Sequence, residues 1–323
     1  MSQHFLLSAA ARTLSLASVA RMSDEKAHET FMSLRWADND GQPYCPFCGC
    51  LKVYTLTEKT PKWKCGACRT KFTVTAQTIF ANRKMPIRDI LLGIAIFANS
   101  AKGHSALQLS RDLEISYKSA FVMAHKIREA LASETANMTI GGAGKVAEVD
   151  GAYFGKVRRK NKVEDRKDQR TAENVAKRSV VVVMRERGGR TLPFVVCKES
   201  EGAAIIRRRV ATGTVVHADE ASSWDRLHAS YDMRRINHSV AYSLDGACTN
   251  QAESFFSRLH RTKINTHHHL SGRRMHAYAS EMAWREDHRR DSNGQQFATI
   301  TALSARHPIS REWAGYWQRA RAA

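Results

Sequence analysis

Four cysteines in two close pairs place the strongest constraint on how this chain folds. Cys45 and Cys48 form one pair, Cys65 and Cys68 form the other, and 16 residues separate the pairs. Two thiols at this spacing can face one ion, so the pattern predicts a tetrahedral four-cysteine zinc site. With it we expect a zinc ribbon, whose short strands lie at residues 51–57, 61–64 and 71–75.

The expected ribbon is too small to fold around an apolar core alone, so its zinc would be structural. Gly49 and Gly66 are expected to give the two cysteine turns their backbone freedom. Cys50 lies outside both pairs and is expected to be a spare thiol. The alternative is that these cysteines are free and buried without metal.

The cysteine content and the apolar runs indicate the cellular compartment of the chain. Seven cysteines, four of them at metal-binding spacing, fit a reducing cytosol better than disulfides. The apolar run at residues 91–98 is much shorter than the roughly 20 residues that span a bilayer. Residues 1–22 lack the basic start and long apolar stretch of a signal peptide, so we interpret them as mature sequence.

The charge of the chain indicates its partner. With 51 Lys and Arg against 31 Asp and Glu, the formal net charge is +20. Such a field attracts phosphate backbones, and we therefore expect a nucleic acid. The length of 323 residues supports more than one domain.

Helical spacing of apolar residues extends over residues 86–132, and three helices are the simplest interpretation. One begins at Ser105, and the last is expected at residues 117–131 after a short turn. A basic second helix across a short turn suggests a helix-turn-helix that enters a major groove. A packing subdomain without DNA is the alternative. The DNA contacts expected here are Lys118, Lys126 and Arg128.

Beyond a linker at residues 133–144, the apolar period changes to two. This alternation predicts a strand with Glu148 and Asp150 on one face, where two carboxylates need a cation or solvent. Residues 155–178 have ten Lys and Arg and little apolar content, so we expect a loop that holds a polyanion or a solvated linker. Its expected DNA contacts are Arg158, Arg159 and Lys160.

The elements that follow predict a ribonuclease H-like mixed sheet. They are strands at residues 179–184 and 191–197 around a hairpin turn at 187–190, a helix at 201–211 and a strand at 214–218. Asp219 ends the last strand, beside the first. Its alternative role is an N-cap for a helix through Ser222 and Trp224.

A helix expected at residues 250–261 carries the third acid, Glu253, on its first turn, with His260 on the same face. The stretch from Asn250 to Glu253 is also a capping box, in which Glu253 only satisfies a backbone amide. Mg²⁺ or Mn²⁺ takes oxygen ligands, and two such ions about 3.5 to 4 Å apart activate an attacking oxygen and stabilise a leaving one. Asp150 would bridge both ions, and Asp219 and Glu253 would hold one each.

Together these motifs resemble those of the DDE-type insertion-sequence transposases that carry a zinc ribbon ahead of a ribonuclease H-like core. The resemblance covers residues 30–290 and rests on the cysteine pairs and on the segments at 148–155, 217–220, 249–256, 267–269 and 281–285. It implies that the chain cuts double-stranded DNA at the terminal inverted repeats of its element and joins the 3′ hydroxyls to a target. It also implies a homodimer or larger assembly in the bacterial cytoplasm, at the nucleoid.

The family also suggests finer residue roles. The resemblance implies that an Asn can take the place of the last acid, and Asn250 is available here. A basic residue commonly lies seven positions after the Glu; His260 occupies that position, which makes Arg261 a substitute. The DNA contacts expected on this helix are Arg258, Arg261 and Lys263.

The expected fold class is multi-domain α/β. The expected domains are an N-terminal helical segment (1–40), the zinc ribbon (41–80), the helical segment (81–135), the catalytic core (145–290) and a C-terminal helical tail (291–323). The histidines at 267–269 are expected to make polar contacts, and residues 284–287 a charged clamp or a surface ion-pair cluster. Trp313, Tyr316 and Trp317 are expected to pack onto the core rather than stack on bases. A nuclease of the same fold and a DNA-binding regulator without a metal are the alternative functions.

Overall fold

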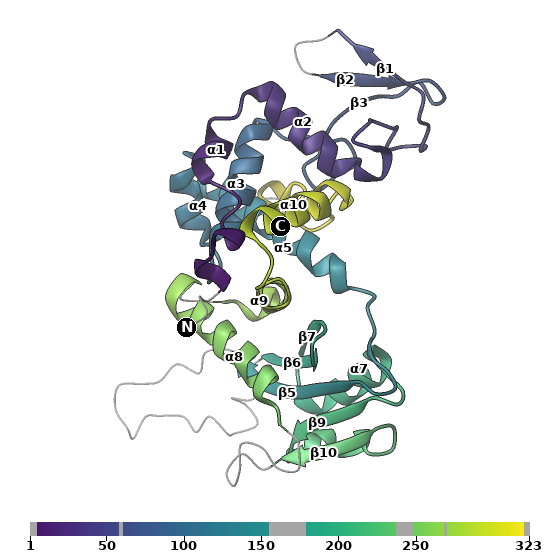
Figure 1. The fold of residues 1–323 in the computed structure, drawn as a ribbon, viewed down its shortest axis with the longest axis vertical. Coiled ribbons are helices and arrows are strands. Elements are labelled where there is room, and N and C mark those ends of the chain that lie inside the picture. Colours follow the sequence, from purple (N-terminus) through teal and green to yellow (C-terminus); the bar gives the residue numbers. More distant parts are fainter. Residues whose placement is uncertain (1–4, 58–60, 155–178, 237–247, 268–269, 320–323) are drawn as a thin grey trace. The chain divides into compact units, whose positions relative to one another are not determined.

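The computed structural model describes residues 5–57, 61–154, 179–236, 248–267 and 270–319, and the chain divides into two compact units (Figure 1). One unit combines Met1–Glu134 with Arg290–Ala323, and the other is Thr135–Arg289. The chain is a mixture of helices and mixed sheets, which confirms the α/β class. Its C-terminal segment belongs to the same unit as the N-terminal helices.

The first unit is mostly helical. The three helices expected over residues 86–132 are present, and Ser105 caps the second of them through the amide of Gln108. Near the C-terminal end, the Asn293 side chain bonds the backbone of Thr13 and Leu14, which joins the two ends of the chain within this unit. The α-helices are α1 (Leu16–Ala20), α2 (Asp24–Arg35), α3 (Ile87–Asn99), α4 (Ala106–Asp112), α5 (Tyr117–Thr135), α10 (Asn293–Arg306) and α11 (Tyr316–Arg319). Short 3-10 helices are η1 (Phe5–Leu7), η2 (Ala9–Ala11) and η3 (Ala37–Asn39).

The expected ribbon strands are present and slightly shorter than expected. They are β1 (Val53–Leu56), β2 (Lys62–Cys65) and β3 (Lys71–Thr73), which form an antiparallel sheet in that order. Trp63 pairs with Phe72 across the sheet and stacks on it, and its ring also contacts Trp36 edge-on and His28. These aromatic side chains are buried, and they supply the small core beside the cysteines.

The second unit contains a five-stranded sheet of order β10-β9-β5-β6-β7. Strands β5, β6 and β7 are antiparallel, whereas β9 and β10 run parallel to β5, which is the ribonuclease H-like arrangement expected from the sequence. The strands are β5 (Val146–Phe154), β6 (Ser179–Glu186), β7 (Thr191–Val196), β9 (Val215–Asp219) and β10 (Asp232–Ile236).

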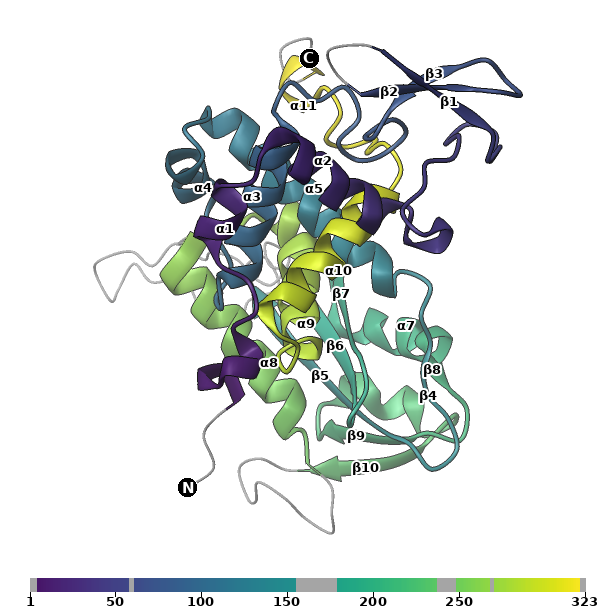
Figure 2. The same ribbon diagram turned by 45° about the horizontal axis from the view of Figure 1, so that its top comes forward.

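Helices cover both faces of this sheet (Figure 2), and strand periodicity assigns the residues to each face. Val180, Val182 and Met184 of β6 pack in one cluster with helix α7 (Gly202–Arg209). Val181 and Val183 pack in the other cluster with helices α8 (Asn250–Thr262) and α9 (Met275–Asp287). Short helical segments complete the unit: η4 (Glu199–Glu201), η5 (Ser222–Leu227), the π-helix η6 (Lys263–His267) and η7 (Gly272–Arg274).

One element differs from the prediction of a helix at residues 201–211. Helix α7 ends at Arg209, and β8 (Val210–Ala211) pairs in parallel with β4 (Ile140–Gly141), inside the segment expected to be a linker. Burial of Val210 and Ile140 explains the change, because β-branched side chains pack well on a paired strand. Among the described residues, no helix combines the length and the apolarity needed to cross a bilayer.

Candidate active site and zinc site

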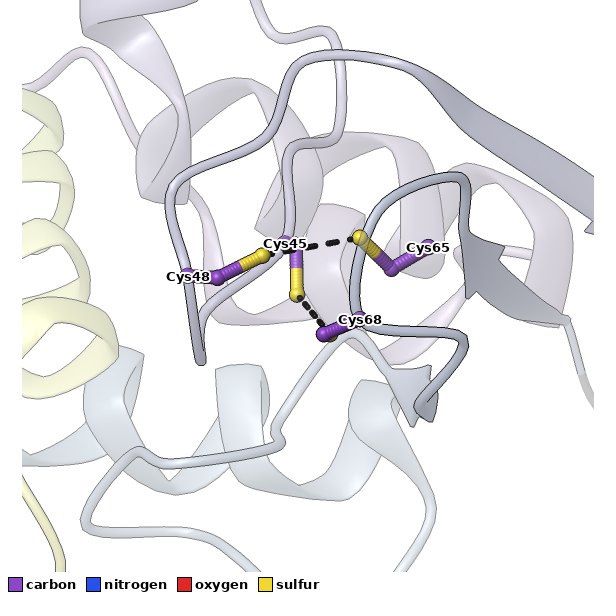
Figure 3. Close-up of side chains that lie close together, drawn as sticks. All are labelled: Cys45, Cys48, Cys65 and Cys68. Carbon is purple, nitrogen blue, oxygen red and sulfur yellow. Dashed lines mark hydrogen bonds between the residues drawn. The ribbon is translucent and has the colours of Figure 1, made fainter.

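The four predicted zinc ligands lie together in the ribbon (Figure 3). The sulfur of Cys45 is 3.6 Å from that of Cys68, the sulfur of Cys48 is 3.6 Å from that of Cys65, and all four lie within 4.8 Å of one another. Zinc–sulfur bonds of about 2.3 Å in a tetrahedron place sulfurs about 3.8 Å apart, so the donor set fits structural zinc. Cys50 lies outside the group, and its thiol is 3.7 Å from the Lys52 carbonyl.

Each of the two cysteine turns has a residue with positive φ directly after its second cysteine, but the residue type differs between the turns. Gly49 has φ +75°, as expected, but the residue in the equivalent position of the second turn is Arg69, with φ +61°. Gly66 has another role, because an added Cβ would lie 2.9 Å from the Lys52 carbonyl oxygen. Hydrogen bonds from Thr70 are the main cause that lowers the pKa of Cys68 to about 6, which favours a thiolate ligand at neutral pH.

The predicted catalytic acids of the two strands lie at adjacent positions of the sheet. The parallel register of β5 and β9 pairs Val149 with Ala218, and Asp150 and Asp219 are the next residues on each strand. Burial is the main cause that raises the pKa of Asp150 to about 7, and the charges of Asp219, Glu199 and Glu253 raise it further. We call Asp150, Asp219, Glu199 and Glu253 the acidic cluster. The charges of the other three members act on Asp150, as like charges near one another do, whereas the four cysteines are the group of described side chains whose ligand atoms lie close enough to hold one ion.

The side chain of Asp219 is oriented by its own neighbours. Its Oδ1 accepts hydrogen bonds from the buried Trp224 indole at 2.8 Å and from the Ala221 amide at 3.2 Å, and Arg235 donates to its carbonyl at 2.6 Å. The segment beyond is the 3-10 helix η5, with Ala221 in the N-cap position and no side-chain cap. The alternative in which Asp219 is a helix N-cap is therefore wrong.

Glu253 lies on the first turn of α8 and accepts a hydrogen bond from the Thr249 hydroxyl at 3.3 Å. The N-cap of this helix is Thr249 rather than Asn250, and no side chain of the N-cap residue bonds the helix amides. The capping box from Asn250 to Glu253 is therefore contradicted. Asn250 itself is exposed at the first position of the helix.

The side chain of Glu148, and not that of the N-cap residue, accepts hydrogen bonds from the first backbone amides of α8. Glu148 shares a strand face with Asp150, as predicted, but it is fully buried, and the cation beside it is the guanidinium of Arg187. Its carboxylate accepts hydrogen bonds from the amides of Gln251 at 2.7 Å and Ala252 at 3.1 Å. Arg187 Nε donates to it at 2.9 Å. The charge is thus matched by a guanidinium and by the positive end of a helix dipole.

The same arginine connects this contact to β9. Arg187 Nη2 lies 3.1 Å from Nδ1 of His217, donates to the Cys248 carbonyl at 3.2 Å and contacts the Cys248 thiol at 2.6 Å. Burial, followed by the Arg187 charge, lowers the pKa of His217, so its imidazole is neutral at pH 7. Residues from β5, β9 and the start of α8 are therefore held in one hydrogen-bonded group, next to each of the three predicted acids.

Glu199 is the member of the acidic cluster that the sequence reasoning missed. One of its oxygens accepts from the Ser223 hydroxyl at 3.0 Å, and the other would lie 2.1 Å from a Cβ added at Gly151. Burial is the first cause that raises the pKa of Glu199, and the charge of Asp219 adds to it. The available signal was an acid just after a buried strand, at the same edge of the sheet as Asp219.

The predicted DNA contacts on α5 take different places. Lys118 Nζ lies 5.5 Å from the centroid of the Trp317 ring, and Lys126 is half-buried. Arg128 is 1% exposed and donates to the His104 carbonyl at 3.2 Å. Its guanidinium faces the core of the first unit, so the burial of Arg128 contradicts a role in contacting DNA.

Near α8, two predicted contacts meet the ring of Phe154 at the end of β5. His260 stacks on it with ring centroids 4.6 Å apart, and Lys263 Nζ lies 5.9 Å from the ring centroid. Burial and the Lys263 charge lower the pKa of His260, so it offers a neutral hydrogen-bonding group at pH 7. Arg261 donates a hydrogen bond to the Ser257 hydroxyl at 2.9 Å. Arg158, Arg159 and Lys160 lie outside the described residues, as do residues 268–269.

Arg258 belongs to an internal ion-pair group. Its Nη1 lies 2.5 Å from a carboxylate oxygen of Glu286, which is 6% exposed by side chain. Arg185 pairs with Asp287 in the same region, where burial is the first cause that raises the Asp287 pKa. The expectation of a clamp or surface cluster at residues 284–287 is therefore wrong, because these acids are buried and paired. His267 contacts Tyr278, with ring centroids 4.7 Å apart.

The C-terminal aromatics pack on α5 of the first unit. Trp313 stacks on His125 with centroids 4.4 Å apart, and it and Trp317 contact Phe121. Packing is thus the role of Trp313, which is 4% exposed, whereas Trp317 and Tyr316 are half-buried.

Two protein-family models match this chain, one over the region of the acidic cluster and one over the region of the four cysteines. Residues 142–287 match the ISXO2-like transposase domain, which contains the acidic cluster, and residues 22–71 match the transposase zinc-ribbon domain, which contains the four cysteines. A search of curated proteins found no match. The two matched regions together account for more than half of the chain and follow the order of the two sites. The chain belongs to the DDE-type insertion-sequence transposases with an N-terminal zinc ribbon.

Proposed function

We propose that this chain is a DNA transposase that cleaves at the ends of its element and joins the freed 3′ hydroxyls to target DNA. The observation that carries the proposal is the acidic cluster, in which β5 and β9 place Asp150 and Asp219 at adjacent positions of the sheet. Burial, and then the charges of Asp219, Glu199 and Glu253, raise the pKa of Asp150 there. An enzyme gains from this arrangement, whereas a protein that only binds DNA gains nothing from acids that face a polyanion.

The donor set fits Mg²⁺ or Mn²⁺, because hard divalent ions take carboxylate oxygens. Two such ions at this site would activate the attacking oxygen and stabilise the leaving oxygen of a phosphodiester. Asp150 would bridge both ions, and Asp219 and Glu253 would hold one each. Glu199 is a fourth candidate ligand, and Asn250 is the alternative to Glu253.

Residues around the cluster would hold these ligands in position. Trp224 and Ala221 fix Oδ1 of Asp219. Glu148 bonds the amides of Gln251 and Ala252, in the same turn of α8 that carries Glu253. A displacement of about 1 Å in such ligands costs much of the rate of phosphoryl transfer, because that chemistry depends on positioning.

The DNA itself would be held by cations. Lys118, Lys126, Arg261, Lys263 and the residues at 158–160 are the proposed phosphate contacts, and their long-range attraction rests on the net charge of +20. Arg258 contributes less, since it pairs with Glu286. Two element ends must be held at once, so we expect a homodimer or larger assembly, at the nucleoid of a bacterial cytoplasm.

The test incubates zinc-loaded protein and Mn²⁺ with duplexes that carry the repeats flanking its own element. We expect nicks at the 3′ ends of the repeats and joined products. Asp150→Asn, Asp219→Asn and Glu253→Gln should each remove both products while DNA binding persists. Glu220→Gln, an exposed acid next to Asp219, is the matched control and should retain activity.

Two other outcomes would overturn the proposal in different ways. Nicks scattered through the duplex would indicate a nuclease of the same fold. A DNA-dependent function that survives all three substitutions would indicate a regulator that needs no metal at this site.

A further inference from the structure

The first unit contains a cavity that no step of the proposed reaction uses. Its volume is about 490 Å³, which is within the range of pockets that hold small ligands. It lies among the segment that precedes α3, the outer face of α5 and the C-terminal segment that leads into α11. The Trp317 indole donates to the Lys118 carbonyl at 3.2 Å, which joins two of these walls.

The charged residues that line the cavity are all cations. They are Arg83, Lys84, Lys118 and Lys126, and no Asp or Glu is among the lining residues. Arg83 and Lys126 are partly buried, and desolvation lowers the pKa of each. Glu129, which does not line the cavity, raises the pKa of Lys126 by its charge, whereas burial is the cause of the lowered pKa of Arg83. Burying a cation is costly, so the Arg83 side of this wall is suited to an anionic ligand.

Hydrogen bonding at Arg83 agrees with this interpretation. Its Nη1 donates to the Met85 carbonyl, but its buried Nε has no hydrogen-bond partner among the described residues. Buried polar groups in native proteins are nearly always satisfied. A phosphate oxygen would supply the missing acceptor and the missing charge together.

Another part of the cavity lining is aromatic. Trp313, Tyr316 and Trp317 line it, with centroids 4.9 Å apart for the first two and 5.2 Å for the last two. Trp313 is anchored against His125 and Phe121, which gives the group a rigid base. Nucleic-acid bases stack on such rings whatever their sequence, because every base has a π-face.

We infer that this cavity binds one unstacked nucleotide of a DNA strand, with its base against Trp317 and Tyr316 and its phosphate beside Arg83 and Lys126. An ion alone would use the cations but not the rings, and an apolar ligand would leave the buried Arg83 Nε without an acceptor. A nucleotide satisfies both sides. The inference rests on the proposed DNA substrate, but it concerns binding in the first unit and not the chemistry of the acidic cluster.

The experiment compares two fluorescent single strands of equal length, one with bases and one abasic, by anisotropy with full-length zinc-loaded protein. Both strands carry the same phosphates, so the ratio of their affinities isolates the base contact. We expect wild-type protein to prefer the strand with bases by about tenfold at constant salt. Trp317→Ala should reduce this preference to about twofold or less, and Trp317→Phe should restore most of it. Tyr117→Ala is the matched control, because Tyr117 is an exposed ring on α5 that does not line the cavity.

A second substitution tests the phosphate side. Lys126→Gln should weaken binding of both strands by a similar factor and leave their ratio unchanged, since it removes a charge and no stacking surface. Equal affinity of wild-type protein for both strands, or a full preference retained by Trp317→Ala, would overturn the inference. If free mononucleotide at micromolar concentration abolishes the preference, the inference is also overturned, because the cavity would then be a site for a soluble nucleotide rather than for a DNA strand. Asp150→Asn should keep the base preference, so a failure of strand cleavage would leave this result standing.

Discussion

Replacement of Asp150 by Asn should make the metal-free protein more stable at pH 8. The reason is that the Asp150 carboxylate is buried beside three other acids. Asn is isosteric and carries no charge. Its carbonyl oxygen can keep the hydrogen bond that Oδ1 accepts from the Gly151 amide at 2.7 Å. The substitution thus removes the repulsion and the cost of burying a charge, and it leaves the local geometry in place.

The magnitude follows from the pKa. Asp150 has its pKa raised from 3.8 to about 7. At about 1.4 kcal/mol for each pKa unit, this corresponds to about 4 kcal/mol of folding free energy at high pH. Relaxation of the metal-free site would lower this figure, so we expect Asp150→Asn to stabilise the second unit by about 2 to 4 kcal/mol at pH 8.

The sign of the pH dependence is set by proton binding. Below pH 3.8, Asp150 is protonated in both the folded and the unfolded state, so it does not change the free energy of unfolding. Between 3.8 and about 7, the folded state binds more protons than the unfolded state, and the free energy of unfolding falls as pH rises. Above about 7 the penalty is complete. The gain from Asp150→Asn should therefore be small at pH 4 and largest at pH 8.

The assay is hydrogen exchange measured by mass spectrometry across a urea series, in the presence of a chelator that leaves the zinc site loaded. Peptides from β5 and β6 report the second unit alone, which matters because the two units need not unfold together. Added Mn²⁺ should stabilise wild-type protein and leave Asp150→Asn nearly unchanged. The reasoning is refuted if Asp150→Asn is no more stable than wild type at pH 8, or if its gain is the same at pH 4. Glu220→Gln is the control, since that acid is exposed.

Three further predictions address the neighbouring contacts. Glu148→Ala should destabilise the second unit by about 3 to 5 kcal/mol and expose the Gln251 and Ala252 amides to exchange, whereas Glu148→Gln should lose less; equal protection in both variants would contradict the capping role. Gly151→Ala should displace Glu199 and weaken Mn²⁺ binding measured by calorimetry, and unchanged affinity would exclude Glu199 as a ligand. Cys68→Ser should reduce the zinc content measured by mass spectrometry and unfold the ribbon, while Cys50→Ser should change neither.

Local patterns were enough to predict the sheet and the three acids. The alternation in β5 and the apolar runs of β6 and β9 each reflect burial of a strand, and a strand needs only neighbouring residues to be recognised. Thiol spacing predicted the zinc site for the same reason. The position of Asp150 beside Asp219 then followed from the strand order of the fold.

Contacts between residues far apart in the sequence could not be predicted from local patterns. The partners of Glu148 are Arg187 and the start of α8, which lie far along the chain, so the sequence predicted that its charge needs a cation or solvent but not which groups supply the pairing. Glu199 was missed because only the folded chain brings η4 against Gly151. Arg128 could have been recognised, because it lies seven residues after Phe121 and four after Ala124, on the apolar side of α5.

The return of the C-terminal segment to the N-terminal helices has a consequence for synthesis on the ribosome. The second unit is continuous in sequence, Thr135–Arg289, whereas the unit that holds the zinc ribbon is completed only by Arg290–Ala323. Translation thus supplies the described strands of the ribonuclease H-like sheet before it supplies α10, which packs with α2 and α3. A chain interrupted near residue 290 would hold an entire second unit attached to an unfinished first unit.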